Sequence, residues 1–178
     1  MATVRVTAIP PGNAGVLETA RRMADYIRAP HPGVDAQAQQ IALELGSASR
    51  WARAAAVYKW VQDHLVYVHD GEAPDAVPWE SGQEGLRSPD YLLRGIANAG
   101  VDYGDCDDYV ILMGALLYAL GIPVAIVLTS GTPSQEYDHV FLRVQTESGP
   151  VYADAITGQP FGWHVPADRV TLWTEIPV

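Results

Sequence analysis

The strongest constraint on the fold is a run of twenty uncharged residues, 109–128, with the sequence YVILMGALLYALGIPVAIVL. Such a run is about long enough to span a bilayer. Gly121-Ile122-Pro123 interrupts it, however, because glycine commonly ends a helix and proline cannot continue one. We therefore predict a buried helix at 106–120 and a buried strand at 124–129 instead of a membrane span. Apolar residues cover nearly every face of this helix, as expected of a helix packed on all sides.

The remaining sequence places helices before and strands after this central helix. The spacing of apolar residues predicts further helices at 16–28, 34–45, about 47–66 and 90–99. Ser47 or Ser49 could cap the third of these, and Ser88-Pro89 begins the fourth. Alternating patterns predict strands at 3–9, 139–144, 151–156 and 169–173. Residues 67–89 are predicted to form a long loop, and the whole order is an α+β pattern.

Charge and cysteine content exclude several classes of function. The formal net charge is −10, so the long-range field repels phosphate and argues against binding to nucleic acid or to an anionic membrane. A single cysteine allows no internal disulfide and fits a reducing compartment. Residues 1–12 have no apolar core of signal-peptide length, so a cytoplasmic protein is expected.

Cys106 is the candidate nucleophile because it opens the buried helix, within the segment GDCDD at residues 104–108. The positive end of the helix dipole favours a thiolate there. Asp105 can cap the helix, and Asp107 and Asp108 suit its first turn, but three carboxylates beside a thiol also oppose the thiolate by charge repulsion. A low thiol pKa therefore requires a positively charged partner, which an imidazolium would supply.

His139 and Asp154 are the candidate partners of this thiol. They lie on two consecutive predicted strands joined by a turn. If Val144 pairs with Val151, His139 faces Ile156, and Asp154 is its diagonal neighbour on the same face, within reach of a hydrogen bond. A slip of one residue would place the two side chains on opposite faces. In this arrangement Asp154 would fix the tautomer and orientation of the imidazole.

The segments around these three residues resemble the transglutaminase-like superfamily. The resemblance rests on GDCDDYVILMGALLYALGIPV, DHVFLRV and VYADA, with support from WARAAAVYKWVQDHLVYVHD and SPDYLL upstream, and it covers the chain from about Arg21 onward. It implies a papain-type triad in which Cys106 is the nucleophile, His139 the base and Asp154 the orienting acid. It also implies a papain-like core in which the central helix carries the cysteine and packs on an antiparallel sheet.

The domain organisation and the reaction follow from the same resemblance. We expect one transglutaminase-like domain over 1–178, with an N-terminal helical part at 1–46 and a catalytic core at 47–178. The implied activity is that of a cysteine peptidase, amidase or acyltransferase, acting on a protein or peptide amide through an acyl-enzyme, with no cofactor and no metal. The Cys106 backbone N–H would stabilise the oxyanion, together with an upstream donor such as Trp79 or Gln83.

A second hypothesis is a structural role. The compact form of the chain, with GDCDD at 104–108 and the tail GWHVP at 162–166, is similar to small proteins encoded by phages and prophages. The chain would then be a virion structural or assembly protein, contacting other phage proteins, with little or no turnover. Its location would be the phage virion and not the cytoplasm.

Other polar residues have plainer interpretations beside functional ones. The competing histidines are His64 and His69, either of which could be structural, and His164, which could line the site. A hard cation such as calcium could bind the cluster formed by Asp102, Asp105, Asp107 and Asp108. The cluster lacks the spacing of an EF-hand, and helix capping is the favoured interpretation. One cysteine and scattered histidines do not suggest zinc.

Overall fold

The computed structural model describes residues 4–46, 48–69, 83–131 and 135–178. Its helices are α1 (Asn13–Arg28), α2 (Pro32–Leu45), α3 (Arg50–His64), α4 (Pro89–Ala99) and α5 (Cys106–Ala119). Its strands are β1 (Val4–Ala8), β2 (Leu65–Tyr67), β3 (Gln83–Arg87), β4 (Asp102–Gly104), β5 (Val124–Ser130), β6 (His139–Thr146), β7 (Gly149–Ala153) and β8 (Leu172–Pro177). Two short 3₁₀ helices, η1 (Ala155–Thr157) and η2 (Ala167–Arg169), lie between β7 and β8.

Side-chain caps set where two of the helices begin. The Ser49 hydroxyl accepts a hydrogen bond from the Ala52 backbone N–H at 3.2 Å, so Ser49 is the cap of α3. Ser47, the alternative, lies outside the described residues. The Ser88 hydroxyl accepts from the Tyr91 N–H at 3.3 Å, and Pro89 follows as the first residue of α4. Each cap pairs one of the N–H groups that a helix leaves without an internal partner.

The main sheet has four antiparallel strands in the order β7-β6-β5-β8. Val144 pairs with Val151, so the register predicted from the sequence is confirmed. The predicted strand at 151–156 was too long, because β7 ends at Ala153 and the chain turns into η1. The last strand was placed too early, since residues 167–169 form η2 and β8 begins at Leu172.

Two small sheets were not foreseen: β3 lies in the segment predicted as a loop, and β2 begins at Leu65, where the predicted third helix was too long because α3 ends at His64. Strand β3 pairs antiparallel with β1, and β2, which ends at Tyr67, pairs in parallel with β4. The sequence of β3, QEGLR, has no β-branched residue, so its propensity for a strand is weak. Its strand conformation depends on β1, which lies about eighty residues earlier in the chain.

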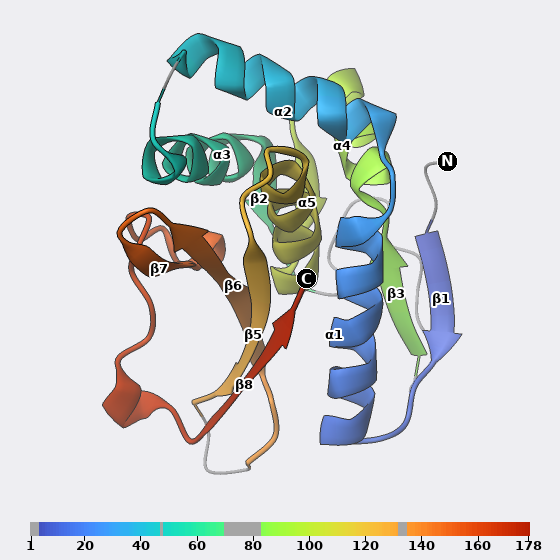
Figure 1. The fold of residues 1–178 in the computed structure, drawn as a ribbon. Coiled ribbons are helices and arrows are strands. Elements are labelled where there is room, and N and C mark those ends of the chain that lie inside the picture. Colours follow the sequence, from blue (N-terminus) through green and yellow to red (C-terminus); the bar gives the residue numbers. More distant parts are fainter. Residues whose placement is uncertain (1–3, 47, 70–82, 132–134) are drawn as a thin grey trace.

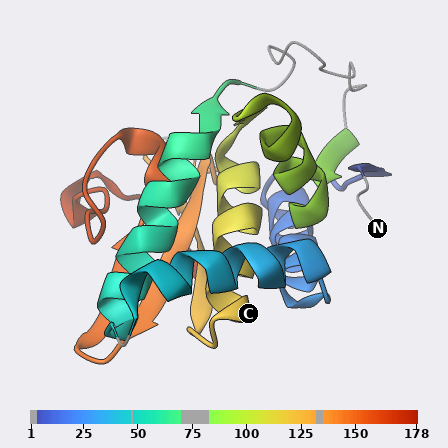
Figure 2. The same cartoon turned by 90° about the horizontal axis from the view of Figure 1, so that it is seen from above.

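Helix α5 lies at the centre of the molecule, between the four-stranded sheet and the other helices (Figure 1). It contacts all four of them, as well as β5 and β6. Seen from above, α2 crosses over α3 and α5 and closes the core on that side (Figure 2). Every residue of α5 from Asp108 to Leu117 is buried, as the apolar pattern predicted. In the described part of the chain no helix combines the length and apolarity needed to cross a bilayer.

Candidate active site

Cys106 is the first residue of α5 and follows directly on β4. Strand β4 pairs with β2 and leads the chain into the centre of the fold, with Asp105 at the N-cap of the helix. Gly104 is required for this close approach, since a Cβ there would lie 2.8 Å from the Asp108 Cβ. The Cys106 side chain is half-buried. The helix therefore presents the thiol at its N-terminus, where the helix dipole favours negative charge.

Arg87 and Asp108 form a buried ion pair beside the first turn of α5. The Arg87 Nε–H donates to Asp108 Oδ1 at 3.1 Å, and Nη2 donates both to Asp108 Oδ2 and to the Tyr103 carbonyl oxygen. The Asp105 backbone N–H donates to Asp108 Oδ2 at 3.2 Å. Burial lowers the pKa of Arg87, but the hydrogen bond and charge of Asp108 outweigh it and hold that pKa above its ordinary value. The pair joins β3 to the helix that carries the cysteine.

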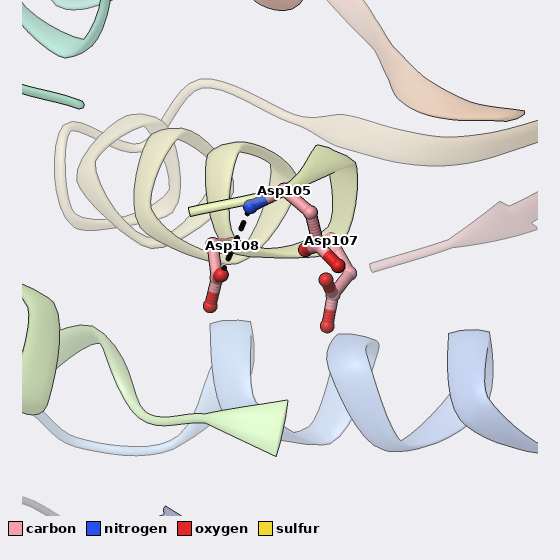
Figure 3. Close-up of side chains that lie close together, drawn as sticks. All are labelled: Asp105, Asp107 and Asp108. Carbon is pink, nitrogen blue, oxygen red and sulfur yellow. Dashed lines mark hydrogen bonds between the residues drawn. The ribbon is translucent and has the colours of Figure 1, made fainter. Parts of the chain in front are cut away.

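Three carboxylates project from this turn: those of Asp105, Asp107 and Asp108 (Figure 3). Their nearest oxygens lie within 4.8 Å of one another, so the cluster has the geometry of a candidate cation site. Asp108 nevertheless has the contacts of a helix cap and of an arginine partner, in line with the favoured interpretation. Burial, followed by the charges of Asp105 and Asp108, raises the pKa of Asp107 well above its ordinary value. A protonated Asp107 adds less repulsion to a nearby thiolate than an ionised one.

His139 and Asp154 form a second polar pair, on the sheet. His139 Nε2 lies 2.9 Å from Asp154 Oδ2, so the predicted contact forms. The predicted pairing of His139 with Ile156 does not form, because the ladder between β6 and β7 ends at Leu142 and Ala153. The His139 side chain is 23% exposed and that of Asp154 only 2%, so the imidazole lies between solvent and a buried carboxylate. Asp154 thus engages the Nε2 atom of the imidazole and not Nδ1.

Cys106 and His139 line the same cleft, whose volume is about 310 Å³. The cleft is lined by helix α1, by the first turn of α5, and by the adjoining ends of β5 and β6 with the residues just before β6. The lining residues are Val16, Thr19, Met23, Asp105, Cys106, Asp107, Leu128, Tyr137, Asp138, His139 and Val140. The cleft thus combines a thiol, an imidazole and several carboxylates with apolar walls.

The competing histidines lie elsewhere among the described residues. The His64 ring stacks on Trp60 at 4.2 Å between centroids, and His64 Nδ1 lies 2.7 Å from the Trp60 carbonyl oxygen. His69 packs edge-on against Tyr67, and His164 against Tyr152. None of the three lines the described cleft.

The two suggested oxyanion donors stay predictions. Trp79 lies outside the described residues. Gln83 begins β3, but its side chain is outside the described part of the chain.

Sequence reasoning did not identify Arg87 or Tyr58 as part of this region. Arg87 fell within the predicted loop, and Tyr58 within the predicted helix at about 47–66. Arg87 donates to Asp108, which lies 21 residues away in the sequence. The Tyr58 hydroxyl donates to the backbone carbonyl oxygen of Asp154, which lies 96 residues away. Tyr137 and Asp138 could have been suspected from their position next to His139.

A sequence profile of the transglutaminase-like superfamily matches residues 35–175. The chain belongs to the transglutaminase-like superfamily. The matched range includes Cys106, His139 and Asp154 together with helices α3, α4 and α5 and strands β5, β6 and β7. No curated protein matches the chain in sequence.

Solved structures are similar to the chain at low sequence identity. A "putative protease" from Parabacteroides distasonis matches with a TM-score of 0.56 and 15% identity, over 85% of this chain and 27% of that one. A "putative cysteine protease" from Cytophaga hutchinsonii gives 0.49 and 14%, over 97% of this chain and 58% of that one. LapG from Legionella pneumophila gives 0.47 and 17%, over 89% and 79%. The chain thus spans about a quarter of the first of these proteins, and the likeness concerns the fold alone.

Proposed function

We propose that this chain is a cysteine-nucleophile hydrolase or acyltransferase that acts on an amide bond of a protein or peptide through an acyl-enzyme. One observation carries the proposal: Cys106 and His139 line a common cleft, and His139 is hydrogen-bonded to the buried Asp154 at 2.9 Å. A purely structural role does not require a thiol and an imidazole in the same cleft. Membership of the superfamily supports the assignment of roles, with Cys106 as nucleophile, His139 as acid and base, and Asp154 as the orienting group.

The proposed reaction begins with attack of the Cys106 thiolate on the amide carbonyl, which forms a carbon–sulfur bond. His139 holds the thiol proton and transfers it to the departing amine as the carbon–nitrogen bond breaks, leaving an acyl-enzyme. A water molecule or a second amine then attacks the acyl carbon and passes its proton to His139, and the thiol is restored as the carbon–sulfur bond breaks. Water gives hydrolysis, and an amine gives transamidation.

The pH dependence of Cys106 alkylation by iodoacetamide tests the thiolate–imidazolium pair. An ordinary thiol titrates near ~8.5, whereas a thiol paired with an imidazolium stays reactive well below ~7. We expect fast alkylation at low pH in the native chain and its loss in His139→Ala. His64→Ala, which removes a histidine stacked outside the cleft, is the matched control and should leave the profile unchanged. An ordinary profile in the native chain would refute the proposed ion pair.

Turnover is tested by mass spectrometry of the chain after incubation with peptide amides and activated esters. We expect an acyl adduct on Cys106 that disappears with time and does not form in Cys106→Ser under the same conditions. Addition of a primary amine distinguishes the two fates, because transamidation yields the amine conjugate and hydrolysis the free acid. A reactive thiol that never forms an adduct with any of these substrates would argue against acyl transfer.

A further inference from the structure

The position of Asp154 is not fixed by the strand that leads to it. Strand β7 ends at Ala153, and Asp154 adopts φ −104° and ψ 83° before the chain enters η1. Its carboxylate reaches His139 through Oδ2, while Oδ1 is buried and has no hydrogen-bond partner among the described residues. Side-chain contacts therefore anchor the carboxylate at one oxygen, and its location depends mainly on how the backbone of this turn is held.

Helix α3 holds that turn through Tyr58. The buried Tyr58 hydroxyl lies 3.0 Å from the Asp154 carbonyl oxygen and 2.7 Å from that of Gln159. Its single proton is therefore shared between two carbonyl oxygens, one before and one after η1. One helical turn later, Gln62 Nε2 donates to the Ala155 carbonyl oxygen at 3.2 Å. The Thr157 hydroxyl adds a hydrogen bond to the Asp154 carbonyl oxygen at 3.0 Å. The turn is thus tied to a helix that lies about one hundred residues earlier in the sequence.

We propose that Tyr58 is a positioning residue for the His139–Asp154 pair, holding the Asp154 backbone so that its carboxylate meets His139 Nε2. This inference rests on the proposed function for its catalytic meaning, since Tyr58 itself is not among the residues that line the described cleft. A displacement of Asp154 by about 1 Å would lengthen the 2.9 Å contact beyond hydrogen-bond range. The imidazole would then lose the group that fixes its tautomer and stabilises its positive charge.

The chemistry of Tyr58 suits a permanent donor. Burial, with a smaller contribution from the Asp154 charge, raises the pKa of Tyr58 to about 12. The phenol therefore keeps its proton, and its hydrogen bonds, across the pH range in which a thiolate–imidazolium pair exists. The Tyr58 ring also contacts Phe161, with 5.6 Å between centroids, a contact that phenylalanine would retain.

The test compares Tyr58→Phe with Tyr109→Phe. Tyr109 is the matched control because it is also buried, also has a pKa raised to about 12, and donates its hydroxyl proton to the Leu65 carbonyl oxygen. Both substitutions remove a buried hydrogen bond and should lower the denaturation midpoint to a similar extent. We expect only Tyr58→Phe to slow Cys106 alkylation at pH 6, by about tenfold, and to change the proton NMR resonance of His139 Nε2–H.

A double variant and the NMR signal separate this inference from the proposed function. In a His139→Ala background, Tyr58→Phe should have no further effect on alkylation, because it acts through the imidazole. If Tyr58→Phe lowers stability as Tyr109→Phe does but leaves both the alkylation profile and the His139 resonance unchanged, Tyr58 is merely structural and the inference fails. If the native thiol proves ordinary while the resonance still responds to Tyr58→Phe, the positioning role stands and the proposed function falls.

Discussion

The carboxylate of Asp154 is buried. Within the described part of the chain, its Oδ2 contacts His139 and its Oδ1 has no hydrogen-bond partner. A buried charge is costly unless a partner compensates it, and removal of one partner leaves the other uncompensated. The contact between these two side chains thus has a structural consequence that is independent of any turnover, and it can be measured in the absence of a substrate.

We expect His139→Ala to lower the free energy of unfolding by about 3 kcal/mol at pH 7, because Asp154 is left without its donor. Adding Asp154→Leu should restore about 1 kcal/mol or more of this loss, since an apolar side chain of similar size needs no partner. Arg143→Ala on the same strand breaks the more exposed ion pair with Glu175 and should cost less than about 1 kcal/mol. Urea denaturation measures all four proteins, and equal losses for His139→Ala and Arg143→Ala would contradict the argument.

Asp107 makes the stability of the fold depend on pH. Because its pKa is raised in the folded chain, the folded state keeps a proton that the unfolded state releases above about pH 4. The folded state therefore binds more protons than the unfolded state in this range, and stability falls as pH rises until the folded pKa is passed.

We expect Asp107→Asn to remove this slope, so that the variant gains stability relative to the native chain with rising pH, by at most about 1.4 kcal/mol per pH unit. Asp25→Asn, at a carboxylate whose side chain is 76% exposed, is the control and should leave the slope unchanged. Thermal or urea unfolding between about pH 4 and pH 8 gives the measurement. Parallel curves for Asp107→Asn and the native chain would show that Asp107 is ionised in the fold.

At the scale of elements, the position of the thiol depends on how closely α5 packs against α1. Gly114 lies in the middle of α5, and a Cβ there would come within 2.6 Å of Ile27 Cδ1 and 3.0 Å of Ile27 Cγ1 on α1. Glycine thus allows a close approach of the helix that carries Cys106 and the helix that forms one wall of the cleft. Tight cores accommodate added volume poorly.

We expect Gly114→Ala to destabilise the fold by about 1–3 kcal/mol, although alanine favours helices by about 1 kcal/mol over glycine. Ile27→Val removes the Cδ1 atom nearest to the new methyl group and should itself cost about 1 kcal/mol. The double variant should lose at least about 1 kcal/mol less than the sum of the two single losses. Strict additivity of the unfolding free energies would show that the two positions do not clash.

The elements that local pattern determines could be predicted from the sequence. The central helix and its following strand were found from a single apolar run, and the His139–Asp154 contact from the alternation of two strands and the turn between them. The end of β7 could not be predicted from the sequence, because the backbone of Asp154 turns away from the strand where the Tyr58 hydroxyl on α3 donates to its carbonyl oxygen. Strand β3 and the Arg87–Asp108 pair were missed for the same reason: their partners lie far away in the sequence.

At the scale of the whole molecule, charge controls what can approach the cleft. The formal net charge is −10, and the carboxylates of Asp105 and Asp138 line the cleft itself. Such a field lowers the local concentration of anions at low ionic strength and is screened as salt is added, with a Debye length that falls from about 30 Å at 0.01 M to about 8 Å at 0.15 M. A neutral reagent of the same size does not experience this field.

We therefore expect iodoacetate, an anion, to alkylate Cys106 more slowly than neutral iodoacetamide at low salt, and the ratio of the two rate constants to rise about three- to tenfold between about 10 and 300 mM salt. A small neutral thiol treated with the same two reagents is the control, and its ratio should stay nearly constant. Asp138→Asn, which removes one exposed carboxylate from the cleft rim, should raise the ratio at low salt and reduce its dependence on salt.

A ratio that does not respond to salt would mean that the field does not reach Cys106. A ratio that rises with salt but is unchanged in Asp138→Asn would assign the repulsion to the net charge of the molecule, because a long-range field sums over many groups, whereas an effect of the cleft must respond to the carboxylates that line it.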